Sequence, residues 1–332
     1  MRVCDFSLSI LFLKPALKET IWGGNKLRDD FGMVSDAKNI AEAWMLSCHE
    51  DGESHVINGE FAGKTFSDVL EKELGMSALG TDCAECKSAE DFPILIKLID
   101  AQDKLSVQVH PDDEYAAANE KDIRGKTEAW YIIDSDSDAE LIYGFKDDIT
   151  KEQFRKSIEN GTLLDNVNFE KVKPGDVAFI PSGTLHAIGK GILLAEVQQS
   201  CNTTYRVFDY NRPGLDGKPR QLHINKSVDV TNCTVPGRNL QPEGMPVKHD
   251  GYISVLLCEC SYFSMTSVEI EALFADCADE KSFVSIIILD GSGKIKNHDE
   301  EYSVKKGDSI FLPADSGAYY ISGKVKILLT RV

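Results

Sequence analysis

One histidine of the chain stands in a pattern that could aim it at a bound ligand. The segment "SVQVHPDDEY" (106–115) alternates polar and apolar residues, and Pro111 then ends the alternation. Such alternation predicts a strand whose successive side chains point to opposite faces. Gln108 and His110, two residues apart, therefore share one face and present an amide oxygen and an imidazole nitrogen to the same point.

A glutamate and a second histidine supply further metal-ligand chemistry. Glu128 opens the apolar and aromatic stretch "EAWYII", where a buried carboxylate is costly unless it is paired, binds a metal or reaches water. His186 follows the tight turn "PSG", so it begins a return strand that faces the interior of the fold. Two imidazoles and one carboxylate with an open position form the donor set of a catalytic zinc site. The sequence therefore predicts a metal bound by His110, Glu128 and His186, to which Gln108 could add an amide oxygen.

An arginine further along the chain could contribute positive charge to such a site. The segment "TYRVFDY" (204–210) alternates as a strand, with Arg206 on the face opposite to Asp209. The planar guanidinium fork can hold a phosphate or neutralise an oxyanion. The alternative is a surface arginine that pairs with Asp209 or Asp216. The remaining histidines are expected to be ordinary polar residues: His49, His55, His223, His249 and His298.

The composition is that of a globular protein with a strong negative charge. The chain has 332 residues, of which 42% are hydrophobic and 27% charged, and its net charge is −18. This charge argues against nucleic acid or an anionic membrane as the main partner, although a local basic pocket can still bind a small anion. The apolar stretch at residues 8–13 is too short for a secretion signal, and no run approaches the roughly 20 residues of a membrane span. We expect a cytoplasmic protein, and the sequence leaves its oligomeric state open.

The nine cysteines include two close pairs, a C-x-x-C at Cys83 and Cys86 and a C-x-C at Cys258 and Cys260. A zinc knuckle needs two such pairs joined by a compact loop, whereas more than 170 residues separate these two. We therefore interpret them as unrelated thiols, kept reduced in the cytoplasm, and expect no metal on cysteine.

Most of the chain is patterned as short strands bounded by turn residues. Apolar runs such as "FPILIKLID", "GILLAEVQQ" and "SFVSIIILDG" are rich in Ile, Val and Leu and are bounded by Gly, Pro, Asp or Ser. Helical signals are few: residues 65–74 have the spacing of one helix face, and residues 150–161 open on a Thr N-cap and end at Gly161. The predicted fold class is mainly β with a few short helices.

An internal repeat predicts the architecture. The segment "VKPGDVAFIP" (172–181) recurs as "VKKGDSIFLP" (304–313), with Val, Lys, Gly, Asp, Phe and Pro in register. Two such turn–strand–Pro units in a β-rich chain predict two jelly-roll barrels. A stretch rich in Pro, Gly and Asn separates a first domain, residues 1–235, from a second, residues 240–332. The second copy lacks a counterpart of His186, so the metal site is expected only in the first domain.

Longer motifs show a resemblance to a known family. "GDVAFIPSGTLH" has the G-x5-P-x-G-x2-H spacing of the second cupin motif, whose histidine is a metal ligand. Together with "FLKPALKETIWGGNKL", "DKLSVQVHPDDEYA", "GKTEAWYII" and "EVQQSCNTTYRVFDYNR", it resembles type I mannose-6-phosphate isomerases in their short bacterial form. The resemblance covers residues 12–230, and "QVHPDD" and "TTYRVFDY" are its most specific parts. It is weaker over the C-terminal barrel.

The resemblance implies a cofactor and a set of site residues. The zinc ligands of the family fall on four residues of this chain: Gln108, His110, Glu128 and His186. The catalytic arginine matches Arg206, and Lys126 matches a lysine that transfers a proton or contacts phosphate. Lys97 and Glu196 are expected to contact the substrate. The cofactor implied is one Zn²⁺ per chain, although the same ligands accept manganese, cobalt or iron.

The activity implied is the interconversion of mannose 6-phosphate and fructose 6-phosphate through an enediol. The metal would act as a Lewis acid on the sugar oxygens, and Arg206 would add charge where the enediolate develops. The base stays open among Lys126, Glu196 and a metal-bound hydroxide. The expected partner is thus a small sugar phosphate. The alternatives are a sugar-binding cupin without turnover and a cupin metalloenzyme of another class, such as a dioxygenase or an epimerase.

Overall fold

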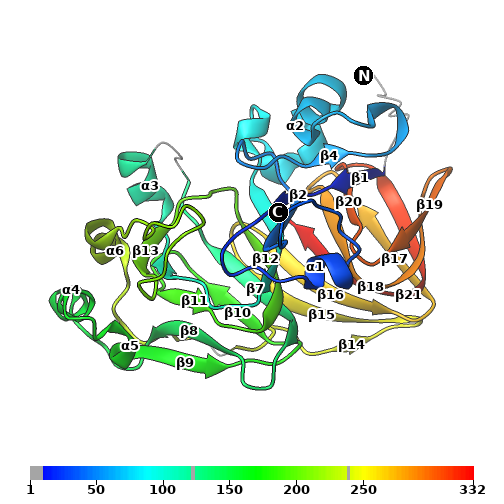
Figure 1. The fold of residues 1–332 in the computed structure, drawn as a ribbon. Helices are drawn as coiled ribbons and strands as arrows, with labels where there is room; N and C mark the ends of the chain where they lie inside the picture. The colour runs from blue at the N-terminus through cyan, green and yellow to red at the C-terminus, as the bar shows by residue number, and fades with distance from the viewer. Residues whose placement is uncertain (1–9, 121–123, 238–239) are drawn as a thin grey trace.

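The structure, a computed structural model, describes residues 10–120, 124–237 and 240–332 (Figure 1). Three antiparallel sheets make up most of the described chain, and short helices lie at its periphery. The mainly β fold class with a few short helices is therefore confirmed. None of the described helices is long and apolar enough to cross a membrane.

The central sheet has six strands in the order β10, β7, β12, β5, β3, β2. Their bounds are β2 (Ala16–Lys18), β3 (Glu42–Leu46), β5 (Ile94–Ala101), β7 (Glu128–Ser135), β10 (Val177–Ile180) and β12 (Ile192–Gln199). Every residue of β5 and β12 is buried, because both faces of this sheet are covered. Ile96 and Ala195 pack on one face with Leu289 and Leu328 of the C-terminal sheet described below.

The second sheet of the first half has five strands in the order β13, β6, β11, β8, β9. Their bounds are β6 (Val107–Val109), β8 (Glu140–Phe145), β9 (Val167–Lys171), β11 (His186–Ile188) and β13 (Tyr205–Phe208). Its inner face packs on the central sheet, since Tyr143 and Ile188 share a core with Trp130 and Ile132. We call it the site sheet. The functional side chains described below lie between these two sheets.

Helices cover the outer face of the site sheet. They are α3 (Asp113–Asn119), α4 (Lys151–Glu159), α5 (Leu163–Asn166) and α6 (Ile224–Val230). The helix predicted at 150–161 is α4: the Thr150 hydroxyl accepts the Gln153 amide at 3.1 Å, and Gly161 follows with φ 71°. Phe154 of α4 and Val228 of α6 pack against the outer face of the sheet.

The remaining helical segments precede β5. They are α1 (Lys26–Asp29), α2 (Phe66–Val69), a π turn (Leu70–Leu74) and the short 3₁₀ turns Gly59–Phe61, Met76–Leu79, Thr81–Cys83 and Ala89–Asp91. The helix predicted at 65–74 is present as α2 and the π turn, with the Thr65 hydroxyl as N-cap for Asp68.

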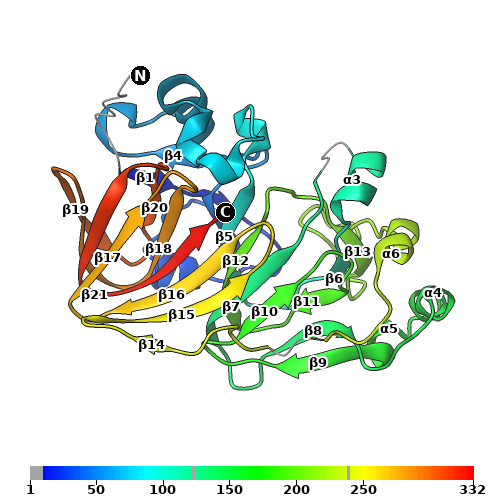
Figure 2. The ribbon, with the colours of Figure 1, turned by 180° about the vertical axis from the view of Figure 1, so that it is seen from behind.

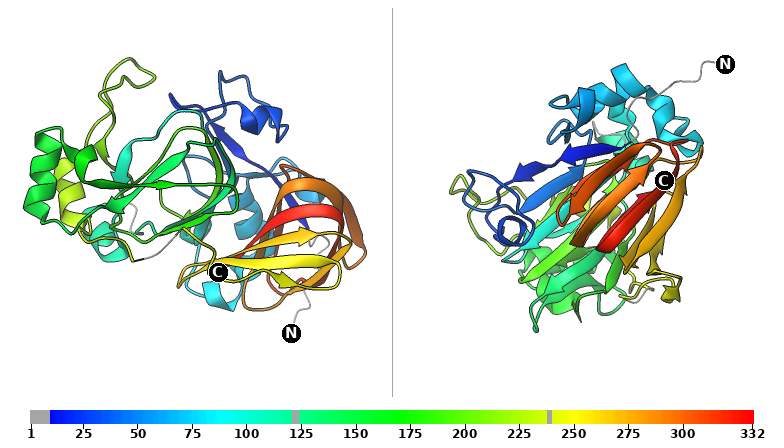
Figure 3. Two further views of the ribbon diagram at one scale, coloured as in Figure 1. Left: turned by 90° about the horizontal axis from the view of Figure 1, so that it is seen from below. Right: turned by 90° about the vertical axis from the view of Figure 1, so that its right-hand side faces the viewer.

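The C-terminal sheet has ten strands, and two long ones fold it over an apolar interior (Figure 2). The strands are β1 (Leu11–Lys14), β4 (His55–Val56), β14 (Val247–Lys248), β15 (Tyr252–Glu259), β16 (Ser264–Ile270), β17 (Leu273–Ala278), β18 (Val284–Asn297), β19 (Glu300–Lys305), β20 (Ser309–Leu312) and β21 (Gly317–Arg331). The first half of β21 pairs with β17 and its second half with β16. In the part of the chain that the structure describes, no sheet closes into a continuous barrel; each half is built of facing layers (Figure 3).

The first strand of the chain joins the C-terminal half. β1 pairs with β20, with Leu11 opposite Phe311, and β4 pairs with β1 in turn. The boundaries 1–235 and 240–332 remain a prediction, and the N-terminal segment contributes two strands to the sheet of the second unit.

The repeat seen in the sequence is a repeat of local structure. In the first copy the Asp176 carboxylate accepts the Lys173 amide at 2.9 Å, and in the second copy Asp308 accepts the Lys305 amide at 2.8 Å. The glycine before each aspartate has a φ of 95° or 92°, a left-handed conformation that favours glycine. After the second turn the interior is filled by apolar side chains, among them the fully buried Tyr319.

Candidate functional site

One row of functional side chains crosses the site sheet. Gln108 on β6 lies directly opposite His186 on β11 and opposite Arg206 on β13. Directly opposed residues of an antiparallel pair lie on the same face of the sheet. The alternation within each strand therefore places one arginine, one amide and one imidazole on a line that faces the central sheet.

A second row crosses the central sheet. Trp130 on β7, Glu196 on β12, Lys97 on β5 and Trp44 on β3 are opposed in that order. The Trp130 indole N–H donates to Glu196 Oε2 at 2.8 Å, and Lys97 Nζ lies 3.1 Å from Glu196 Oε1. Lys97 also lies over the Trp44 ring, 5.1 Å from its centroid. Each charged group of this buried row is thus held by a neighbour.

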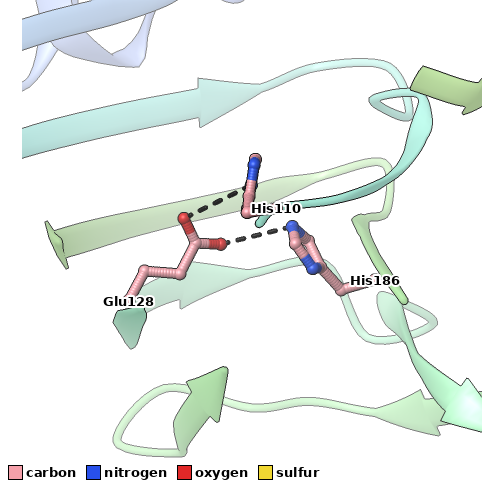
Figure 4. Close-up of side chains that lie close together, drawn as sticks. All are labelled: His110, Glu128 and His186. Carbon is pink, nitrogen blue, oxygen red and sulfur yellow. Dashed lines mark ion pairs between the residues drawn. The ribbon is translucent and has the colours of Figure 1, made fainter. Parts of the chain in front are cut away.

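His110, Glu128 and His186 come together beside these two rows, with their ligand atoms within 4.8 Å of one another. Figure 4 shows the Glu128 carboxylate pointing toward both imidazole rings, with Oε1 3.3 Å from His186 Nε2 and Oε2 3.7 Å from His110 Nε2. All three side chains are at most 1% exposed. Among the described residues, this is the one group of three or more His, Cys, Asp or Glu side chains that could share a metal ion.

The two imidazoles are oriented by backbone carbonyls. His110 Nδ1 lies 2.9 Å from the Thr203 carbonyl oxygen, and His186 Nδ1 lies 2.8 Å from that of Thr184. A carbonyl only accepts hydrogen bonds, so Nδ1 carries the proton in each ring and Nε2 keeps its lone pair. Both Nε2 atoms face Glu128. A second ring nitrogen fixed by a carbonyl is the usual arrangement of metal-binding histidines.

The buried surroundings of the cluster favour the binding of a cation. It lowers the pKa of His186 to about 3, and together with the charge of Lys126 it holds the pKa of His110 well below its usual value, so both rings are neutral ligands. Burial and the nearby Glu196 raise the pKa of Glu128 to about 7. The surroundings of Glu128 therefore disfavour its ionised form, and its buried Oε1 accepts no hydrogen bond. Two neutral imidazoles and this oxygen fit a divalent metal.

Gln108 and Lys126 lie beside the cluster. Gln108 Nε2 is 3.3 Å from His186 Nε2, so metal ligation by its amide oxygen requires the amide to turn over. Lys126 Nζ donates to Glu128 Oε2 at 2.5 Å and lies 3.2 Å from His110 Nε2. Burial alone would lower the pKa of Lys126, but the carboxylates of Glu128 and Glu196 raise it overall. Lys126 is therefore an ammonium at the edge of the cluster.

A cavity of about 330 Å³ opens above the cluster between the two sheets. It is lined by five of the predicted site residues, namely Lys97, Gln108, Lys126, Glu196 and Arg206, and also by Ser106, Glu42 and Arg220. Counting also Glu128, which the cavity residue Lys126 contacts, the charged side chains leave a net charge of one positive in a protein whose total is −18. An anionic substrate is thus attracted locally despite the overall charge.

Arg206 is half-buried at the cavity and is not the partner of Asp209. Its Nε donates to the Ser106 hydroxyl at 3.3 Å and its Nη1 to the Gln221 carbonyl at 3.1 Å. The buried Asp209 carboxylate instead receives two hydrogen bonds from Arg220, at 2.6 and 2.7 Å, and one from Arg212 at 3.2 Å. The alternative that Arg206 pairs with Asp209 or Asp216 at the surface is therefore not what the structure has.

All eight predicted site residues lie at one place, but some of their neighbours could not be predicted from the sequence. Thr203 and Ser106 act through a carbonyl and a hydroxyl, which carry no recognisable pattern. Arg220 follows a Pro- and Gly-rich loop, and the only signal for it is its distance of 14 residues from Arg206 in the same basic stretch. His223, which the sequence predicts to be an ordinary polar residue, accepts the Arg206 amide at 3.2 Å through Nδ1.

Known proteins share the sequence and the fold. Residues 10–155 match the family model "Phosphomannose isomerase type I, catalytic domain", and residues 254–332 match "Mannose-6-phosphate isomerase, cupin domain". The chain is 39% identical to mannose-6-phosphate isomerase ManA of Bacillus subtilis over 97% of its own length and 98% of the relative's. It is 36% identical to the mannose-6-phosphate isomerase of Streptococcus mutans, over 97% and 98% of the two chains.

Solved structures agree with these matches. The crystal structure of the mannose 6-phosphate isomerase from Bacillus subtilis superposes with a TM-score of 0.89, at 36% identity, over 98% of this chain and 100% of that one. A mutant phosphomannose isomerase from Salmonella typhimurium, at 18% identity, has the same fold with a TM-score of 0.76 over 97% and 99% of the two chains. The chain belongs to the type I phosphomannose isomerase family.

Proposed function

We propose that this protein interconverts mannose 6-phosphate and fructose 6-phosphate with the help of one divalent metal ion. The observation that carries the proposal is the buried cluster of His110, Glu128 and His186 next to a cavity lined by Arg206 and Arg220. A metal-binding group at one end and guanidinium groups at the other suit a substrate with a reactive carbonyl and a phosphate. The relatives named mannose-6-phosphate isomerases support the choice of sugar.

His110, Glu128 and His186 would hold the metal, and we propose zinc because two imidazoles and a carboxylate with an open position suit it. When bound, the metal supplies Lewis acidity for the oxygens of the sugar carbon atoms that exchange a proton. Gln108 is the nearest amide and would be a fourth ligand after its amide turns over. Metal analysis of the purified protein identifies the ion and its stoichiometry.

The distance from His186 to Arg206 across the site sheet indicates the length of the substrate site. Arg206 lies two strands from His186, a span of about 10 Å at the usual strand spacing, which suits an extended six-carbon sugar phosphate. Arg220 lines the cavity beside Arg206, and Asp209 holds it by two hydrogen bonds. We assign the phosphate to Arg220. Arg206 provides positive charge between the phosphate and the reacting end.

Two titratable residues of the cavity can move protons. Burial opposes the ionisation of Glu196, but the ammonium groups of Lys126 and Lys97 lower the pKa of Glu196 to about 2. Its Oε1 lies 3.1 Å from Lys97 Nζ and 3.9 Å from Lys126 Nζ, so two ammonium groups keep the carboxylate ionised in the cavity. Lys126 carries the complementary proton. Glu196 as proton acceptor and Lys126 as proton donor are therefore the pairing we propose for the transfer between C1 and C2.

An assay of the purified protein tests the proposal. Fructose 6-phosphate formed from mannose 6-phosphate is measured by a coupled reaction before chelation, after chelation and after zinc is restored. Activity that disappears with the metal and returns with it supports the proposal. Substrate binding without turnover would favour a sugar-binding cupin instead. Oxygen consumption would favour a dioxygenase.

We also propose that the protein works in the cytoplasm, where its phosphorylated substrate is a metabolite. Five cysteines of the described residues are free thiols, namely Cys48, Cys83, Cys86, Cys233 and Cys277, which supports a reducing compartment. The partner required by the proposal is the sugar phosphate alone.

A further inference from the structure

The C-x-x-C motif forms a tight turn that brings two thiols together. Cys83 ends the 3₁₀ turn Thr81–Cys83, and the Cys86 amide donates to the Cys83 carbonyl at 2.9 Å. A turn closed from residue i to i+3 keeps its terminal Cα atoms within about 7 Å, close to the separation that a disulfide requires. The two thiols are also within hydrogen-bonding reach of each other. The pair is therefore one dithiol and not two unrelated cysteines.

The turn is held in place from outside. The Thr81 and Asp82 amides donate to the carbonyls of Glu280 and Lys281, each at 2.9 Å, so the turn is bound to the loop before β18. A side chain at Gly80 would meet the Lys281 carbonyl oxygen at 2.2 Å, which shows how close the two backbones lie. A fixed backbone keeps the thiols near the bonding geometry, so little rearrangement precedes a bond between them.

The two thiols differ in exposure and in charge environment. Cys83 is 5% exposed, whereas Cys86 is half-buried between the exposed residues Glu85 and Lys87. Cys86 Sγ lies 3.0 Å from the Asp91 carbonyl oxygen, which the Arg124 guanidinium also contacts. The hydrogen bond from Cys83, and then the charge of Arg124, lower the pKa of Cys86 to about 7 against the effect of burial. Cys86 is the nucleophile of the pair, since thiolates react and thiols do not.

We propose that Cys83 and Cys86 form a reversible redox dithiol that exchanges with small-molecule disulfides. The Cys86 thiolate, its proton lost to water, attacks one sulfur of the small disulfide; that S–S bond breaks and one thiolate leaves and is protonated. Cys83 then loses its proton and attacks the Cys86 sulfur of the mixed disulfide, which releases the second small thiol. Two protein thiols are oxidised and one disulfide is reduced to two thiols, so atoms and electrons balance.

The rest of the chain supplies a matched comparison. Cys277 is exposed on β17, and its side chain offers an accessible thiol outside any C-x-x-C turn. It can form a mixed disulfide with a small molecule, but it has no neighbour in the motif to resolve it. Metal binding is not the role of the C-x-x-C pair, because no cysteine belongs to a metal-capable group among the described residues.

The test uses the metal-loaded full chain and bis(2-hydroxyethyl) disulfide as the probe at neutral pH. Peptide mass mapping of the wild type should show the loss of two hydrogens from the peptide that contains both cysteines, with no lasting adduct on Cys86. In Cys83→Ser the adduct on Cys86 should persist, and in Cys86→Ser the buried Cys83 should stay unmodified. Cys277→Ser should leave the chemistry of the pair unchanged.

Two outcomes would overturn the proposal. One is an adduct on Cys86 of the wild type that persists as long as that on Cys277, because no resolving thiol would then be in reach. The other is a Cys83→Ser protein in which Cys86 reacts no faster than a buried cysteine such as Cys201. Thermal unfolding of each variant confirms that it is folded before the comparison, and Cys83→Ala replaces Cys83→Ser if the hydroxyl prevents folding.

Discussion

Replacing Arg220 by glutamine removes one of the two guanidinium groups that line the cavity and leaves the metal cluster untouched. Arg220 lines the cavity, whereas its Nε and Nη2 atoms hold Asp209 at 2.7 and 2.6 Å. A third guanidinium nitrogen remains available for a ligand. We therefore expect the substitution to weaken the binding of the phosphate group without changing the chemistry at C1 and C2.

The size of the effect follows from the kind of bond that is lost. A hydrogen bond to a charged group contributes about 1.5–3 kcal/mol, which corresponds to a roughly 10- to 150-fold rise in KM for mannose 6-phosphate. The inhibition constant of inorganic phosphate should rise in step, because phosphate alone makes the contact. The value of kcat should stay within a factor of about three, since uniform binding is lost rather than stabilisation of the transition state. Steady-state kinetics with inorganic phosphate as a competing ligand measure all three.

Arg212 provides a control on the same carboxylate. It donates to Asp209 at 3.2 Å but does not line the cavity, so Arg212→Gln removes a partner of Asp209 without removing a cavity group. We expect Arg212→Gln to lower the melting temperature as Arg220→Gln does, but to leave KM unchanged. If both variants raise KM equally, Arg220 acts by shaping the loop, and its assignment to the phosphate is wrong. If neither does, the phosphate binds elsewhere.

Three further predictions concern the metal, the catalytic charge and the pH dependence of stability. Substitution of any metal ligand by alanine should abolish isomerase activity, with metal content falling in parallel, in each of these variants: His110→Ala, Glu128→Ala and His186→Ala. Arg206→Ala should keep the metal and lower kcat by about 10²-fold or more, and Arg206→Lys should restore activity only in part because an ammonium lacks the planar fork. Burial opposes the ionisation of Asp209, but Arg220 and Arg212 lower its pKa overall. This stabilisation is therefore complete above the unfolded pKa of about 3.9 and is lost as the pH falls through the lower folded value. The gap in melting temperature between wild type and Asp209→Asn should accordingly narrow below about pH 4.

Each of these has an outcome that contradicts it. A ligand variant that keeps full metal and full activity would remove that residue from the metal site. A change in KM alone for Arg206→Ala would make Arg206 a phosphate anchor, and no change at all would make it structural. A gap between wild type and Asp209→Asn that is constant from pH 7 to pH 2 would show that the pKa of Asp209 does not change on folding.

Features set by neighbouring residues could be predicted from the sequence. The alternation around residue 108 places Gln108 and His110 on one side of a strand, because successive strand residues point to opposite faces. The turn with Asp176, and its copy with Asp308, depends on a side chain that hydrogen-bonds an amide three residues before it. The Thr150 cap of α4 has the same local origin. In each case all the interacting atoms lie within a few residues of one another, so the pattern contains the whole interaction.

Features that depend on distant partners were decided by the tertiary structure. The sequence placed Arg206 near Asp209, but an irregularity in the pairing of β13 after Arg206, and left-handed backbone at Tyr210 and Asn211, redirect the chain. Arg220 then donates the hydrogen bonds to Asp209. Arg220 follows a loop whose sequence has neither the strand nor the helix period, so this contact could not be predicted.

The same holds for the partners of the metal cluster. The Thr203 carbonyl that orients His110 lies 93 residues from it, and Lys97 meets Glu196 only because β5 and β12 pair in that register. β1 pairs with β20, which lies near the other end of the chain. Local patterns therefore could not predict to which sheet β1 belongs. Residue types and local spacing identified which groups can do the chemistry. Their mutual distances, and hence their pKa values and the cavity between them, arise only when the two sheets pack face to face and exclude water.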